Sequence, residues 1–311
     1  MKTHELICIV DNGPHTPPDD QTQCVSVGPY TAILSTASRP LVSLPMSRAE
    51  AMRQAAARQA LFERLLPMGT VVAAKPQLWL TPDQAATCLR ANAGVLDETC
   101  AWLRHKAQFQ ITVAWDAAQV LDRFRDTPEI SPLFAAETTT PDALERAISR
   151  LRNRLGAHIR QLLDPVVTDI IALPVTDDML CNFAVLIPGK AEAQLDRCVE
   201  AIDAIWSDGF RIRQIGPSAA GSFALLDLAW VTADDIKAAH RLLSLDLGAP
   251  QDAVQSARRR ALMTSQGETS HIKHAARIVD STRQSGADGF HLATLLSEDQ
   301  GLGDATWTAV A

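Results

Sequence analysis

Short apolar runs separated by turn-forming residues open the chain. Runs of this kind, bounded by Gly, Pro, Asn and Asp, predict β-strands. The segment 109–115 alternates apolar and polar positions, which is typical of a half-buried strand. In the first part of the chain we expect strands at 6–10, 24–27, 30–35, 41–44, 70–74 and 109–115.

Apolar positions recur at helical spacing between these strands. Ser47 is a suitable N-cap for a helix that Pro67 ends, spanning about 47–65. The segment 81–84, Thr-Pro-Asp-Gln, combines a capping box with Pro at the first helical position. It predicts one helix to about Leu103, whose buried apolar stripe is interrupted by Gly94. A shorter helix is expected near 116–126.

The second half shows a clearer alternation of helices and strands. A helix beginning at Thr140 places its apolar side chains within an arc of ~80°. These side chains are Leu144, Ile148, Leu151, Leu155, Ile159 and Leu162. Further strands are expected at 166–173, 180–187, 210–215 and 222–228, and further helices at 191–206 and 232–245. This order predicts an antiparallel sheet with helices on one face, close to a ferredoxin-like domain.

These elements predict an α+β protein with two α+β domains and a helical C-terminal tail. Residues 127–140 have little periodicity and contain Pro132, so we place a domain boundary there. The predicted parts are an N-terminal α+β domain (1–130), a ferredoxin-like domain (141–245) and an extension (246–311). The extension is expected to contain helices at 251–263 and 269–283 and to end in about 25 loosely ordered residues.

Composition agrees with an ordinary globular protein. The 311 residues are 47% hydrophobic and 21% charged, which allows a sizeable core without disulfides or metals. The net charge of −7 argues against a broad nucleic-acid interface, and the basic cluster 258–260 is local. The apolar run 6–10 is too short for a signal peptide, and no run reaches the ~18 apolar residues of a membrane span. We therefore expect a cytoplasmic protein.

Candidate chemistry is sparse. The six cysteines, Cys8, Cys24, Cys88, Cys100, Cys181 and Cys198, form no C-x-x-C pair and are expected to be reduced thiols. The turn 216–221 has one residue too many for a G-x-S-x-G nucleophile elbow, and 189–190 lacks the upstream glycine of a phosphate loop. His271 and His274 have no evident third ligand. We expect no catalytic residue, no cofactor and no metal, and so no enzyme.

Two stretches resemble signatures of a known family. Residues 65–72, Leu-Leu-Pro-Met-Gly-Thr-Val-Val, follow a helix and precede a helix and a strand that ends in Trp115. Residues 178–187 form an apolar strand, and Ile215-Gly216-Pro217 is followed by Ser222-Phe223-Ala224. Over about residues 5–245 this order resembles the gas vesicle GvpL/GvpF family. The family's Trp-Pro-Pro-Tyr turn is replaced by residues 218–221, so the chain resembles a divergent member.

The resemblance implies a non-catalytic role in building or lining the gas vesicle. It implies as partners the gas vesicle shell protein and other gas vesicle accessory proteins, and a location at the gas vesicle. The segments that match the signatures are the candidate partner contacts: Pro67, Met68, Gly69, Thr70, Gly216, Pro217 and Ser222. Two alternatives remain open, namely a general or chaperone-like cytoplasmic adaptor and an enzyme with an unrecognised small-molecule site.

Overall fold

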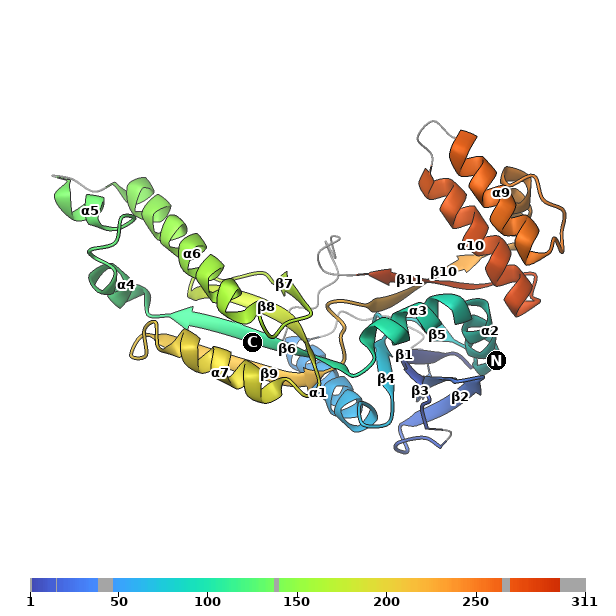
Figure 1. Cartoon of the computed structure of the whole chain (residues 1–311). Helices are drawn as coiled ribbons and strands as arrows, with labels where there is room; N and C mark the ends of the chain where they lie inside the picture. The colour runs from blue at the N-terminus through green and yellow to red at the C-terminus, as the bar shows by residue number, and fades with distance from the viewer. Residues whose placement is uncertain (1, 15, 39–46, 137–139, 265–268, 297–311) are drawn as a thin grey trace. The chain divides into compact units, whose positions relative to one another are not determined.

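The computed structural model describes residues 2–14, 16–38, 47–136, 140–264 and 269–296. The predicted strand 41–44 lies outside these residues. The chain forms two compact units (Figure 1). Within the described residues, unit 1 consists of residues 2–104 and 224–296, and unit 2 consists of residues 105–223.

Unit 1 contains an antiparallel sheet built from the N-terminal part of the chain. Its strands are β1 (His4–Asp11), β2 (Thr22–Val27), β3 (Tyr30–Ser38), β4 (Thr70–Ala73) and β5 (Trp79–Leu80). The order is β2-β3-β1-β4, and β5 also pairs with β1. The central strand β1 is fully buried at its middle, from Cys8 to Val10.

Three helices follow in the N-terminal part of unit 1. They are α1 (Arg48–Leu65), α2 (Pro82–Ala91) and α3 (Ala93–Leu103). Only the C-terminal end of α1 is buried, through Leu61, Phe62 and Leu65, and Met52 near its start is exposed. Polar contacts hold α1 elsewhere: Arg58 Nη2 donates to Glu5 Oε1 at 2.6 Å.

The single helix predicted over 81–103 is broken at Asn92, which lies between α2 and α3. Asn92 caps both helices with non-helical dihedral angles. Its buried side chain donates to His291 O at 2.8 Å and accepts from Ala293 N at 2.7 Å. The break follows from a tertiary contact with a distant strand, which helical periodicity does not reveal.

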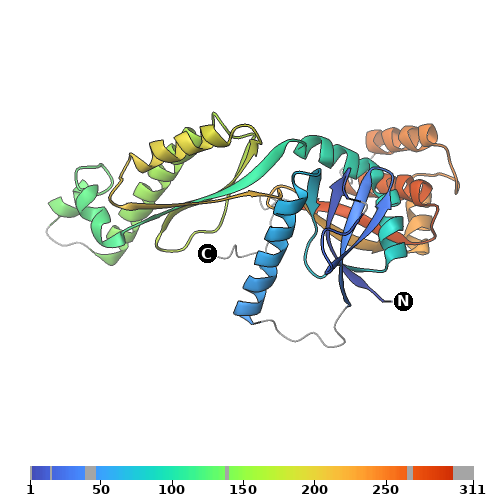
Figure 2. The same ribbon diagram turned by 90° about the horizontal axis from the view of Figure 1, so that it is seen from below.

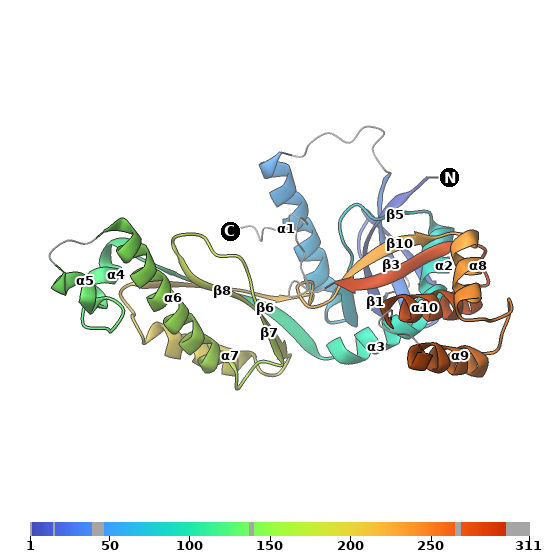
Figure 3. The same ribbon diagram turned by 90° about the horizontal axis from the view of Figure 1, so that it is seen from above.

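The C-terminal part of the chain completes unit 1. It consists of β10 (Leu225–Val231), α8 (Ala233–Leu242), α9 (Gln251–Thr264), α10 (Thr269–Ser285) and β11 (Phe290–Leu296). Strands β10 and β11 pair antiparallel, and α8 and α10 pack together in the same core (Figure 3). Residues up to 296 of the predicted helical and partly loose extension 246–311 contribute to this core through Ile272, Val279 and Phe290.

Unit 2 is a four-stranded antiparallel sheet with helices on one face. Its elements are β6 (Lys106–Trp115), α4 (Ala117–Arg123), α5 (Ser131–Ala135), α6 (Pro141–Leu163), β7 (Asp169–Ala172), β8 (Met179–Pro188), α7 (Glu192–Asp203) and β9 (Phe210–Ser218). The strand order is β7-β8-β6-β9. Helices α6 and α7 lie on the same side of this sheet (Figure 2). The βαββαβ order of β6, α6, β7, β8, α7 and β9 supports a ferredoxin-like description, which stays a prediction.

The boundaries of the two compact units differ from those of the predicted domains. The strand at 106–115, assigned to the N-terminal domain, is the inner strand β6 of unit 2. The strand predicted at 222–228 corresponds to β10, which lies in unit 1 rather than in the second domain. The proposed boundary 127–140 lies inside unit 2 and contains α5. Alternation locates a strand but does not say which strand it pairs with.

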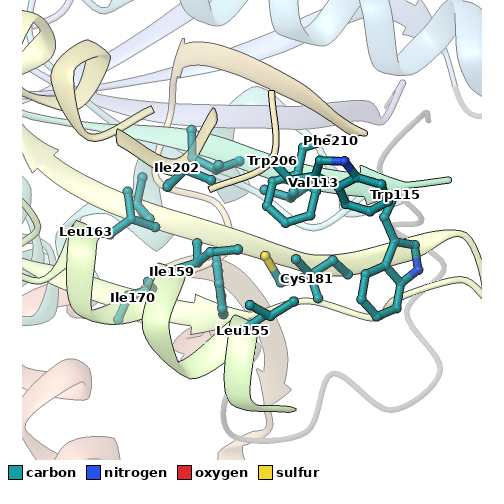
Figure 4. Packing of buried hydrophobic residues seen from close by; sticks show 14 of the residues in the cluster. Val113, Trp115, Leu155, Ile159, Leu163, Ile170, Cys181, Ile202, Trp206 and Phe210 are labelled. Atoms are coloured by element: carbon teal, nitrogen blue, oxygen red, sulfur yellow. The ribbon is translucent and has the colours of Figure 1, made fainter. Parts of the chain in front are cut away.

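The core of unit 2 lies between the sheet and α6 and α7 (Figure 4). Strand β6 buries alternate residues, from Phe109 to Trp115, as its pattern predicts. Helix α6 presents a buried stripe of Ala147, Leu151, Leu155, Ile159 and Leu163. Trp206 packs edge-on against Phe124, with ring centroids 5.4 Å apart. The buried stripe of α6 therefore agrees closely with the apolar face predicted for this helix.

Candidate functional site

The segment 67–70 joins α1 to β4 in unit 1. Helix α1 ends where the amides of Met68 and Gly69 bond to Leu65 O, at 2.9 and 3.3 Å. Pro67 cannot donate such a bond, so the chain leaves the helix there. Pro67 and Met68 are exposed, and Met68 retains 50% of its accessible surface. This segment therefore presents an apolar tip to the surface of unit 1.

Gly69 has a packing role. A Cβ atom at this position would lie 2.0 Å from the carbonyl oxygen of Asp11. Thr70 then pairs with Asp11 across strands β4 and β1. Glycine is required because two backbone segments approach each other here. Gly69 and Thr70 therefore fix the position of Pro67 and Met68.

The segment 216–222 forms the end of β9 and the turn that follows it, in unit 2. Gly216 has a φ of +145° and precedes a cis peptide bond to Pro217. A Cβ atom on Gly216 would lie 2.6 Å from the ring of Phe109. Gly216 and Pro217 are exposed, so this turn also presents a small apolar surface.

Ser222 is buried rather than presented to a partner, with 8% of its surface exposed. Gln108 of β6 binds it twice. Ser222 N donates to Gln108 Oε1 at 3.0 Å, and Gln108 Nε2 bonds to Ser222 Oγ at 3.0 Å. Ser218 Oγ donates to the carbonyl oxygen of Gln108 at 3.2 Å. The two serines therefore fix the turn, which agrees with its interpretation as a turn rather than a nucleophile elbow.

The seven predicted contact residues are divided between the two units, and they also differ in how exposed they are. Pro67 to Thr70 lie in unit 1, and Gly216 to Ser222 lie in unit 2. Four of them are exposed, namely Pro67, Met68, Gly216 and Pro217. Gly69, Thr70 and Ser222 are partly or fully buried and support the exposed ones.

Other polar side chains outside the two segments have structural surroundings. Asp235 accepts from Thr232 in a capping box at the start of α8. His271 and His274 are exposed on α10. Across the ranges that the structure describes, no three His, Cys, Asp or Glu side chains gather as a metal site. Among the same residues, no helix has both the length and the apolar character needed to cross a membrane.

The cysteine side chains are all free thiols. Burial raises the pKa of Cys88, Cys100 and Cys181 to about 12. The thiolate is the reactive form of cysteine, so these three side chains are not nucleophiles at neutral pH. They act as small core residues.

The sequence did not reveal a cavity between α5 and the first half of α6. Its volume is about 280 Å³, and it is lined by Glu129, Pro132, Leu133, Ala136, Ala143, Arg146 and Arg150. Glu129 Oε1 accepts from Arg154 Nε at 2.8 Å. Burial raises the pKa of Glu129, but the bonds from Arg154, its own amide and Thr127, with the charge of Arg154, outweigh this and hold the pKa below its usual range. The spacing of the arginines along α6 was the feature of the sequence that could have indicated this cavity.

This chain is similar to gas vesicle proteins in sequence. The family model "Gas vesicle synthesis protein GvpL/GvpF" matches residues 6–224. The chain is 30% identical over 137 residues to gas vesicle protein F of Dolichospermum flosaquae, covering 40% of this chain and 56% of that relative. The chain thus spans just over half the length of this curated relative.

Two solved structures share the fold. The crystal structure of gas vesicle protein GvpF from Anabaena sp. PCC7120 matches 71% of this chain and 97% of its own, with a TM-score of 0.56 and 19% identity. That of GvpF from Microcystis aeruginosa matches 71% and 98%, with a TM-score of 0.54 and 20% identity. The α+β fold class predicted from the pattern of helices and strands is confirmed.

Proposed function

The chain belongs to the gas vesicle GvpL/GvpF family, and from this premise we propose that it is a non-catalytic accessory protein that binds the gas vesicle shell protein. The observation that carries the proposal is the family match, which runs from residue 6 to residue 224. It includes all of unit 2 and the N-terminal segment of unit 1. The role in gas vesicles predicted from the signatures is confirmed at the level of the family. Binding of the shell and of other accessory proteins, the lack of catalysis and a place at the vesicle in the cytoplasm belong to the proposal.

The exposed ends of the two signature segments are the proposed contacts. Pro67 and Met68 extend from a backbone that Gly69 holds against β1. Gly216 and Pro217 extend from a turn that Gln108 holds through Ser222. A rigid, exposed apolar tip suits a hydrophobic contact, because little side-chain and backbone freedom is lost on binding.

The test is retention of purified shell protein on the immobilised full-length chain. Met68→Glu places a charge in the first contact, and we expect it to reduce retention about tenfold, since a desolvated charge opposes an apolar interface. The matched control is Met263→Glu. Met263 is 87% exposed on α9 and lies outside the family match, so its substitution is expected to leave retention unchanged.

The second contact is tested in the same way. Pro217→Glu is compared with Pro128→Glu, which alters another exposed proline of unit 2. Circular dichroism of each variant establishes that it is folded. Equal retention by both folded contact variants would exclude these two segments as the contact. No retention of shell protein or of any accessory gas vesicle protein by the unaltered chain would contradict the proposal and favour the general-adaptor alternative.

A further inference from the structure

Helix α6 concentrates positive charge in a chain whose net charge is −7. Arg146, Arg150 and Arg154 are four residues apart and therefore lie on one face of the helix. All three are exposed, and each directly precedes a residue of the stripe that packs on the sheet, so this face flanks the stripe. The face forms a basic surface near the N-terminal end of α6.

The arginines of this face differ in their partners. Arg154 is paired with Glu129. Arg146 and Arg150 have no ion-pair partner among the residues that the structure describes. Both line the cavity between α5 and α6. These two guanidinium groups are therefore available to an anionic ligand, and arginine can bind a carboxylate through two parallel hydrogen bonds.

The remainder of the cavity supplies apolar contact. Pro132 and Leu133 line it from α5. Phe134, beside them, is 45% exposed, and the guanidinium of Arg125 lies 4.4 Å from its ring centroid. Glu129 also lines the cavity, but its Oε2 is buried and its carboxylate is paired with Arg154. A ligand for this site should combine carboxylates and an apolar side chain.

We propose that the α5–α6 cavity binds an acidic peptide segment of a partner protein. Its carboxylates bind Arg146 and Arg150, and an apolar side chain enters beside Leu133. The volume of about 280 Å³ lies at the lower limit of the ~300–1,000 Å³ typical of small-molecule pockets, and it suits one or two side chains. The site is distinct from the two signature segments and does not depend on the shell-protein proposal.

The experiment measures fluorescence anisotropy of a labelled probe titrated with the full-length chain. The probe is a short peptide of glutamate and leucine, and its twin has glutamine in place of glutamate. We expect the acidic probe to bind, and the twin to bind at least about tenfold more weakly. The double variant Arg146→Glu with Arg150→Glu should weaken binding of the acidic probe by at least the same factor.

A control variant separates the cavity from general charge attraction. Arg160→Glu changes an exposed arginine of the same helix that does not line the cavity, and it should retain binding. Equal weakening by Arg160→Glu, or equal binding of the two peptides, would overturn the proposal. Absence of binding by the acidic probe, or self-association of the chain that is lost in the double variant, would also overturn it.

Discussion

At the scale of single residues, the family signatures combine exposed and structural positions. Gly69 and Gly216 are glycines because another segment lies where a Cβ atom would be. Ser222 is buried and bound by Gln108. The sequence pointed to these positions but did not separate a residue that touches a partner from one that shapes the backbone. Met68 and Pro217 are exposed and belong to the proposed contacts, Gly69 shapes the backbone, and Gly216 is exposed but also has no room for a Cβ atom.

Gly69→Ala tests this division. The new methyl group would meet the carbonyl oxygen of Asp11, so we expect the free energy of unfolding to fall by about 1–3 kcal/mol. Urea denaturation measures it. Gly94→Ala is the matched control, because a Cβ atom at this position would meet nothing within 4 Å apart from its chain neighbours and the nearby backbone of α3. Alanine there should raise stability by up to about 1 kcal/mol. Equal changes in the free energy of unfolding for the two substitutions would show that the backbones of Gly69 and Asp11 do not approach each other tightly.

At the scale of elements, the positions of helices and strands were predicted well, but the pairing of the strands was not. The alternation of 109–115 identifies β6 as a strand, and the apolar stripe identifies α6. Neither pattern states that β6 lies between β8 and β9 in unit 2. A strand far from its partners in sequence is assigned to a unit only by its pairing.

Ile159→Ala tests the assignment of β6. Ile159 is fully buried in the core that α6 shares with β6 and β8. Its truncation should cost unit 2 about 2–5 kcal/mol of stability. In native-state hydrogen exchange, amides of β6 should then exchange faster together with those of β8. Amides of β1 should keep their exchange rates. Faster exchange in β1 with unchanged exchange in β6 would instead support the predicted N-terminal domain.

At the scale of the whole molecule, unit 1 is built from both ends of the chain. Strand β10 follows unit 2 in sequence and forms a bridge with Ala74, and Lys75 Nζ lies 3.0 Å from Asp227 Oδ2. Asn92 and Arg277 bond to the backbone of β11. Residues beyond the family match therefore stabilise residues within it.

Val279→Asp tests this dependence. Val279 is fully buried on α10, and an ionised carboxylate there lacks a partner, so unit 1 should lose at least ~3 kcal/mol of stability. Lys273→Asp, on the exposed face of the same helix, is the control and should change stability little. Hydrogen exchange should quicken in β1 and β10 but not in β8. Unchanged exchange in β1 would mean that the C-terminal helices fold as a separate part.

The sequence by itself determined the α+β class, the family and most helix and strand positions. These properties follow from neighbouring residues: the apolar stripe of α6, the alternation of β6 and the capping boxes at Thr81 and Thr232. Only the tertiary structure decided which strands pair, that β11 belongs to unit 1, and that Glu129 meets Arg146 and Arg150 at one cavity. The reason is physical: these features depend on contacts between residues far apart in the chain, and a local pattern does not contain them.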